Sequence, residues 1–172
     1  MLDSLQNYIL DTNVLIEAHR RYYSFDIAPA FWDFLINSAK TNKILSVDRV
    51  YDEITNGNDE LAEWTKVNFS FAFQNTNNDT DVLLKYGKLM KWANQQTQFS
   101  QAAKDEFAKV ENADPWVIAF ASAKNSIVVT HEVLNKNIKN KIPIPNVCDA
   151  FDVKYIDTFT LLRELNFKFK FK

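Results

Sequence analysis

The sequence predicts an α/β fold, a three-layer αβα arrangement around a central parallel sheet of four or five strands. Short apolar runs typical of buried strands alternate with longer segments in which apolar residues recur at helical spacing. Such alternation favours a parallel sheet covered by helices on both faces. The chain has 172 residues, 47% of them hydrophobic, and no repeat or linker rich in Pro, Gly or Ser. We therefore expect one domain over residues 1–172.

Four predicted strands are short apolar or β-branched runs: Tyr8–Leu10, 43–47, 127–129 and 153–156. Phe69, Phe71 and Phe73 alternate with small residues, as in a short strand or an extended sheet edge. From 167 to 172, Phe and Lys alternate strictly. We favour an edge strand with buried Phe there, and a basic aromatic arm for single-stranded nucleic acid is the alternative.

The predicted helices have apolar residues at helical spacing or a capping signal at their start: one from Pro29, one from Asp48 to Gly57, 79–95, 99–111, one from Asp114, and 158–165. In the second of these, Asp48 is the expected N-cap and Gly57 the expected left-handed terminator. The dipeptide Asp114-Pro115 predicts a carboxylate at the cap and a proline in the first turn.

The composition excludes several classes of site. Gly57 and Gly87 are the only glycines, so no Gly-rich loop is available for a P-loop or a dinucleotide fingerprint. Cys148 is the only cysteine and there are two histidines, which argues against a Cys/His zinc site and fits a reducing compartment. The N-terminus lacks a signal-peptide pattern, and no apolar stretch approaches the ~20 residues that span a bilayer. We expect a cytoplasmic protein without membrane association. The net charge of −2 neither indicates nor excludes a nucleic-acid partner.

Four acidic residues are predicted to share one rim of the sheet. Asp11 directly follows the first strand, and Glu132 follows the strand 127–129. Helix starts share the rim with strand ends in a parallel α/β sheet, which places Asp114 there and Glu53 within reach. Two such charges ~4 Å apart repel by roughly 4 kcal/mol at an effective dielectric near 20. A cluster of four would therefore protonate in part or bind a cation, and oxygen-only ligands favour Mg²⁺ or Mn²⁺.

Each acid also has an ordinary structural interpretation. Asp11 would cap the helix that follows it. Asp114 would cap the helix that has Pro115 in its first turn. Glu53 would be a solvent-facing residue of a short helix, and Glu132, taken alone, is the weakest of the four candidates. The functional interpretation depends on their joint placement.

Four segments resemble the PIN-domain ribonucleases: 8–16 (YILDTNVLI), 50–54 (VYDEI), 113–121 (ADPWVIAFA) and 128–132 (VVTHE). Their order and spacing span nearly the whole chain and are closest to bacterial proteins of the VapC toxin type. The resemblance implies a PIN-like parallel sheet, one or two Mg²⁺ or Mn²⁺ ions, and hydrolysis of RNA. It also implies a protein antitoxin as a partner, and a homodimer is a further expectation.

Carried over residue by residue, the resemblance implies that Asp11, Glu53 and Asp114 bind metal. Thr12, Asn13 and Thr130 would then orient a ligand or a water molecule. The fourth acid of the family is commonly an aspartate, whereas Glu132 stands here, so the resemblance supports the second metal ion less than the first.

Three lysines follow Glu132 in the sequence, namely Lys136, Lys139 and Lys141. They would contact RNA phosphates, or they belong to an ordinary solvated loop.

The leading hypothesis is a metal-dependent endoribonuclease that hydrolyses RNA phosphodiester bonds, the toxin of a toxin–antitoxin pair. The alternative is a catalytically degenerate PIN-like module that binds RNA or protein without cutting. A phosphatase with Asp11 as nucleophile ranks lower, because such enzymes carry a second aspartate two residues on, where Asn13 stands.

Overall fold

The computed structural model describes residues 6–170 and contains one parallel sheet of five strands in the order β3-β2-β1-β4-β5. The strands are β1 (Tyr8–Leu10), β2 (Ile44–Val47), β3 (Phe73–Gln74), β4 (Ile127–Val129) and β5 (Tyr155–Ile156). All four neighbouring pairs are parallel, and β1 lies at the centre with Leu10 opposite Val129. The predicted α/β class is therefore confirmed.

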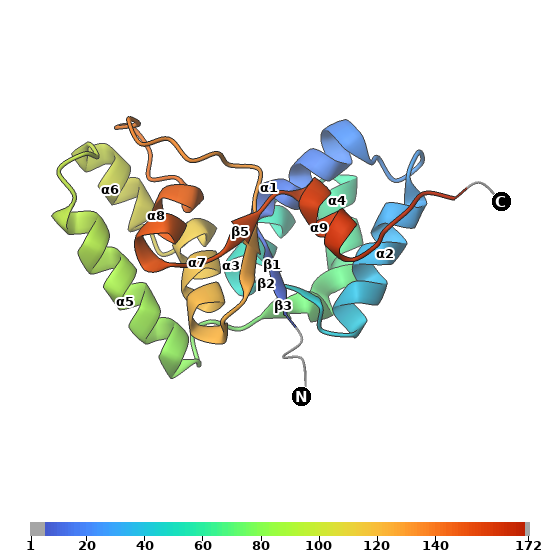
Figure 1. Cartoon of the computed structure of the whole chain (residues 1–172). Helices are drawn as coiled ribbons and strands as arrows, with labels where there is room; N and C mark the ends of the chain where they lie inside the picture. The colour runs from blue at the N-terminus through green and yellow to red at the C-terminus, as the bar shows by residue number, and fades with distance from the viewer. Residues whose placement is uncertain (1–5, 171–172) are drawn as a thin grey trace.

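Nine α-helices are present in the described residues: α1 (Thr12–Glu17), α2 (Pro29–Lys40), α3 (Asp48–Thr55), α4 (Glu60–Trp64), α5 (Thr80–Gln95), α6 (Gln101–Phe107), α7 (Ala113–Lys124), α8 (Ile144–Phe151) and α9 (Thr158–Glu164). Three short helices of other types complete the set: η1 (Ala18–Tyr22) and η2 (Thr65–Phe69), both π-helical, and η3 (Ser70–Ala72), a 3₁₀-helix. Figure 1 shows the strands at the centre, with α5 to α8 on one side and α1, α2, α4 and α9 on the other. This arrangement is the predicted three-layer αβα architecture.

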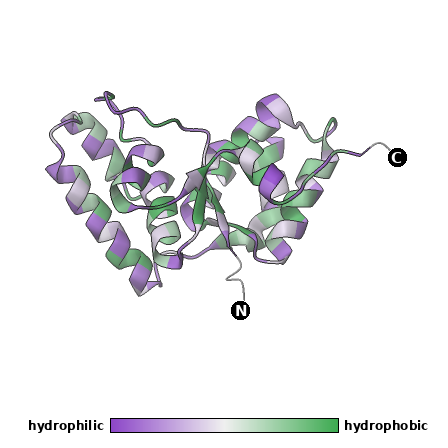
Figure 2. Ribbon diagram, viewed as in Figure 1, coloured by the Kyte–Doolittle hydropathy of each residue, from purple (hydrophilic) through white to green (hydrophobic). Residues whose placement is uncertain are grey.

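The hydrophobic core lies on both sides of the sheet, and the three central strands have no exposed face. Every residue of β1, β2 and β4 is buried, as expected for parallel strands covered on both sides. Helix α7 is buried from Pro115 to Ala121, because it lies between the sheet and α5. Figure 2 shows hydrophobic residues gathered around the strands, with hydrophilic residues on the outer helices. One buried polar group in the sheet, the Ser46 hydroxyl, donates to the Leu10 carbonyl at 2.7 Å.

Helix starts agree with the sequence signals in part. Pro29 opens α2, and Asp79 caps α5 through its side chain. The prediction that Asp48 caps α3 is wrong, because Asp48 is the first residue of that helix and the cap position belongs to Val47. The Asp48 carboxylate instead accepts hydrogen bonds from the backbone and hydroxyl of Thr76. Gly57 is also not in the left-handed conformation expected of a terminator, and α3 ends at Thr55.

The strand expected over Phe69, Phe71 and Phe73 is mostly helical. Thr65–Phe69 and Ser70–Ala72 continue from α4, and Phe73–Gln74 is the only part that pairs with the sheet. Phe69 stacks on Trp64 with ring centroids 5.1 Å apart, and Phe69 is fully buried. This aromatic contact at helical spacing outweighs the alternation that favoured a strand.

The edge strand predicted at the C-terminus is not formed by residues 167–170, and residues 171–172 lie outside the described part. The side chain of Phe167 packs against Phe34 of α2, with ring centroids 4.8 Å apart, and Phe169 is 53% exposed. The helix expected over 99–111 is limited to Gln101–Phe107, and α4 and α8 were not predicted. None of the helices between residues 6 and 170 has the length and apolar character needed to cross a membrane.

Candidate active site

The four predicted acids meet at the carboxyl-terminal edge of the sheet. Asp11 follows β1 directly, and Glu132 lies three residues after β4. Asp114 is the second residue of α7, and Glu53 belongs to α3. The charges of the other three acids raise the pKa of the Asp114 carboxyl group. Segments far apart in sequence therefore converge here. The joint placement expected from strand ends and helix starts is present in the structure.

Asp11 is fully buried and has one oxygen without a protein partner. The Thr130 hydroxyl donates to Asp11 Oδ2 at 3.0 Å, whereas Asp11 Oδ1 accepts no hydrogen bond within residues 6–170. Burial, followed by the charge of Glu132, raises the pKa of Asp11 to about 7. Its side chain makes no capping bond to α1, although Asp11 occupies the N-cap position. The ordinary interpretation of Asp11 as a helix cap therefore holds for its backbone position and not for its side chain.

Asp114 is also free of a capping role. The N-cap of α7 is Asn112, whose side-chain oxygen accepts from the Asp114 backbone amide at 3.0 Å. Within the described chain, the Asp114 carboxylate receives no hydrogen bond. Burial and the neighbouring charges of Asp11 and Glu132 hold the pKa of Asp114 well above its ordinary value. The sequence prediction that Asp114 itself caps the helix is wrong, and this leaves its carboxylate available to a ligand.

Glu53 connects the starts of two helices. Its Oε2 accepts from the Thr12 hydroxyl at 2.5 Å, and its Oε1 accepts from the Ala113 backbone amide at 3.0 Å. Glu53 is exposed, as its ordinary interpretation held, yet both of its oxygens are bound. Thr12, expected to orient a ligand or water, makes its hydroxyl contact with Glu53 instead.

Glu132 is held by a lysine and by a helix start. Its Oε1 forms an ion pair with Lys141, and its Oε2 accepts from the Ile144 backbone amide at 2.8 Å. Thr130 supports the same residue, because its hydroxyl oxygen accepts from the Glu132 amide at 3.1 Å while it donates to Asp11. Thr130 therefore connects the first and fourth acids, whereas the role expected for it was to orient a ligand or a water molecule.

Of the other predicted site residues, some lie close to the acids and others do not. Lys141 reaches the acids, whereas Lys136 and Lys139 are exposed and form no ion pair within residues 6–170. Asn13 is half-buried and lines a shallow pocket with Glu132. Sequence reasoning missed Asn112 and the start of α8. An Asn two residues before Asp114 is itself a capping signal, but the pairing of Glu132 with Ile144 has no local signal.

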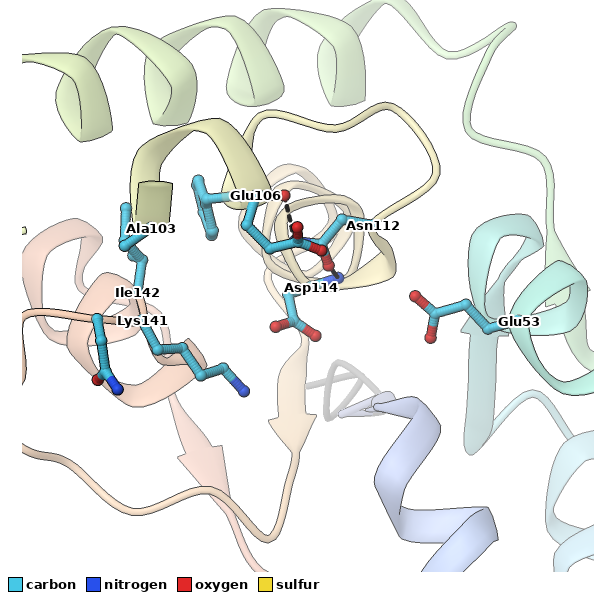
Figure 3. Close-up of a pocket in the computed structure, with 9 residues that line it drawn as sticks. Glu53, Ala103, Glu106, Asn112, Asp114, Lys141 and Ile142 are labelled. Carbon is cyan, nitrogen blue, oxygen red and sulfur yellow. Dashed lines mark hydrogen bonds between the residues drawn. The ribbon is translucent and has the colours of Figure 1, made fainter. Parts of the chain in front are cut away.

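A cavity of about 380 Å³ opens beside Asp114. In Figure 3 the side chains of Asp114, Glu53 and Lys141 project toward the same space. The cavity walls combine these charged groups with apolar side chains: Ala103, Phe107 and Ile142. With Glu106 included, three carboxylates face the one ammonium group of Lys141, so the cavity favours a cation and would accept an anionic ligand only together with one.

The residues present fit a hard divalent cation bound by few protein oxygens. Among residues 6–170, no three His, Cys, Asp or Glu side chains lie close enough to form a complete metal cage. The oxygens of Glu53 and Glu132 already accept protein hydrogen bonds, whereas Asp11 Oδ1 and the Asp114 carboxylate do not. Mg²⁺ keeps several waters and is commonly held by one or two carboxylates, so two carboxylates with open oxygens match the ligand number that such an ion requires.

Residues 8–169 match a family described as a domain of unknown function, DUF4411. The chain belongs to the DUF4411 family. No curated protein sequence is significantly similar to the chain.

Among solved structures, this DUF4411 domain is similar to a chain of VapBC2 from Rickettsia felis bound to a DNA fragment from their promoter. The identity is 16%, the TM-score is 0.52, and the match covers 88% of this chain and 98% of that one. FitAcB from Neisseria gonorrhoeae matches with 17% identity and a TM-score of 0.50, over 87% of this chain and 96% of that one. VapBC-1 from nontypeable Haemophilus influenzae has 17% identity and a TM-score of 0.48, with 88% and 98% covered. The first two similarities show that the DUF4411 domain has the VapC-like PIN fold expected from its sequence.

Proposed function

We propose that this DUF4411 domain is a metal-dependent endoribonuclease that hydrolyses RNA phosphodiester bonds. The observation that carries the proposal is the buried oxygen Asp11 Oδ1, which lacks a protein partner and lies in an acidic centre with Asp114. A buried carboxylate oxygen without a partner is costly unless a cation or water binds it. One Mg²⁺ or Mn²⁺ ion held by the two aspartates would satisfy this oxygen and relieve the repulsion between them.

In this proposal the ion, when bound, lowers the pKa of a water molecule and stabilises the negative charge that develops on the phosphate. The chain's own residues supply the rest. Thr130 fixes the orientation of Asp11 through its hydroxyl. Glu53 holds the start of α7 through the Ala113 amide, which positions Asp114 in the next residue. The cavity beside Asp114 gives a strand of RNA room to approach the acids.

We further propose that the domain is the toxin of a toxin–antitoxin pair and acts in the cytoplasm, bound and inhibited by a protein antitoxin. The support is its fold, which it shares with chains of VapBC2 and FitAcB. A homodimer is a proposal of the same kind.

Cleavage of RNA by the purified protein tests the nuclease. The wild type is incubated with labelled single-stranded and structured RNA in EDTA, in Mg²⁺ and in Mn²⁺. The variants Asp11→Asn and Asp114→Asn are assayed beside Asp33→Asn, a matched control whose exposed carboxylate lies on α2. We expect metal-dependent cutting by the wild type and the control, and none by the two site variants. Cutting by Asp11→Asn at the wild-type rate would refute the proposal.

A binding module without catalysis is the second candidate. The observation that favours it is the commitment of Glu53 and Glu132 to protein hydrogen bonds, which leaves two of the four acids without a free oxygen. Tight RNA binding with no cutting by any form, in either metal, would support the module over the nuclease.

A further inference from the structure

The acidic centre contains a cation of its own. Lys141 pairs with Glu132 Oε1, and its side chain stays 50% exposed while that of Glu132 is only 12% exposed. In Figure 3 the Lys141 side chain extends from the loop before α8 toward Asp114. Its ammonium group therefore lies between the fourth acid and the cavity, with one side open to a ligand.

Lys141 interacts electrostatically with three of the acids and not with Glu132 alone. Burial by itself would lower the pKa of Lys141, but the hydrogen bond to Glu132 and the charges of Glu132, Asp114 and Asp11 raise it. In turn the positive charge of Lys141 opposes the raised pKa of Asp114. Lys141 thus remains charged and offsets part of the negative charge that a phosphate would meet.

Glu132 is poorly placed to bind metal while these contacts hold. One of its oxygens is paired with Lys141, and the other accepts the Ile144 amide at the start of α8. A metal ion at Glu132 would have to displace the ammonium group, because two positive charges so close together repel each other strongly at the dielectric of a protein surface. Glu132 therefore acts as the residue that positions Lys141.

We propose that Lys141 supplies the second positive charge of the centre: its ammonium group binds the scissile phosphate of RNA, together with a single divalent ion that Asp11 and Asp114 would hold. This inference rests on the proposed nuclease function and deepens it. The charge pattern that results is one metal and one lysine, where two metal ions would otherwise be expected to neutralise the phosphate. A lysine is suited to this position because it is a compact point charge that binds phosphate without fixed geometry.

Three measurements on the full chain test the inference. Titration calorimetry with Mn²⁺ counts the ions that the protein binds. Fluorescence anisotropy with labelled single-stranded RNA in EDTA, over a range of salt concentrations, gives the affinity and its salt dependence without cutting. Steady-state cleavage in Mn²⁺ separates kcat from KM. The variants are Lys141→Met, Lys141→Arg and Glu132→Gln.

The matched control is Lys124→Met. Like Lys141, Lys124 is partly exposed and forms an ion pair with an acidic residue, in this case Asp79 at 2.5 Å. Lys124 lies at the opposite end of α7 from Asp114. Its removal changes the net charge by the same amount as the removal of Lys141.

We expect the wild type to bind one Mn²⁺ ion. Lys141→Met should lower kcat by about 100-fold, as the loss of one group that stabilises transition-state charge commonly does. It should also reduce the slope of log affinity against log salt by about 1, whereas Lys124→Met leaves both unchanged. Lys141→Arg should recover part of the rate, because it keeps the charge. Glu132→Gln should retain one ion and lose RNA affinity.

Binding of two ions by the wild type, or wild-type values of kcat and salt slope in Lys141→Met, would overturn the inference while the nuclease stands. Absence of cutting by the wild type in both metals would instead overturn the nuclease and the inference together. Loss of the bound ion in Glu132→Gln would show that Glu132 is a metal ligand and would also overturn the inference.

Discussion

The hydroxyl of Thr12 donates a hydrogen bond of 2.5 Å to Glu53 Oε2, so the residue that follows the first acid positions the second. Thr12 is buried, and its partner stands 41 residues further along the chain. Glu53 passes this constraint on to Ala113, the neighbour of Asp114. Three of the four acids are thus connected through a single pair of hydrogen bonds.

Thr12→Val, which keeps the shape and removes the hydroxyl, should lower the free energy of unfolding by about 1 kcal/mol, because the bond is partly exposed. Under the proposed function it should lower RNA cleavage by about 10- to 100-fold, as the loss of a hydrogen bond that orients the surroundings of a metal site commonly does. Urea unfolding and cleavage assays measure the two effects. Thr12→Ser keeps the hydroxyl and serves as the control. Equal activity of Thr12→Val and wild type would show that Glu53 does not need this contact.

The stability of the protein without divalent ions should fall as the pH rises from about 4 to about 7. Burial raises the pKa of Asp11 from 3.8 to about 7, so the folded state binds a proton that the unfolded state has already released in this range. Each pKa unit corresponds to about 1.4 kcal/mol, so the loss is of the order of a few kcal/mol.

Thermal unfolding in EDTA between pH 4 and pH 8 measures this loss, and Asp11→Asn, which is neutral throughout, should show a smaller decline. Mn²⁺ should restore stability at pH 8 more than at pH 5, since it binds the ionised carboxylates. An identical pH profile for Asp11→Asn and wild type would contradict the assignment of the shift to Asp11.

Asn112→Ala should lower the free energy of unfolding by about 0.5–2 kcal/mol, because the Asn112 side chain caps α7 through the Asp114 amide. Asn112→Asp and Asn112→Ser offer an equivalent acceptor and should lose less. Chemical denaturation ranks the three variants. A neutral effect of alanine would mean that Asp114 or a water molecule takes over the cap.

Cys148 should resist alkylation in the folded protein. The thiol is fully buried in α8, and burial, followed by the charge of Asp149, raises its pKa to about 12. At pH 8 the reactive thiolate is therefore nearly absent, and modification by iodoacetamide requires opening of the structure. Mass spectrometry after timed labelling, with and without urea, checks this. Rapid labelling of the native protein would contradict the burial of the thiol.

Much of the sheet was predictable because each buried strand can be recognised from its own local sequence. The buried strands Tyr8–Leu10 and Ile127–Val129 are continuous apolar runs, and a residue directly after such a strand must reach the sheet edge. That rule located Asp11 and brought Glu132 near it. The same reasoning failed where aromatic packing decided the backbone, as at Phe69, whose contact with Trp64 favours a helix.

The finer arrangement of the site could not be predicted, because it depends on contacts between distant segments. The pairing of Glu132 with Lys141 and Ile144 requires the start of α8 to fold back on the loop after β4. Sequence spacing placed Lys141 near the rim, but it gave no reason to separate Lys141 from Lys136. Likewise, Asp114 and Asn112 both fit a helix cap, and only the geometry distinguishes the two.

The central position of β1 has a consequence for how the protein is made. The first strand to leave the ribosome must wait for β4, more than a hundred residues later, before Leu10 meets Val129 and Thr130 reaches Asp11. A growing chain or a truncated fragment that ends before this point lacks both the fourth acid and the contact that orients the first. The centre is therefore assembled only after β4 and the residues directly after it have joined the fold.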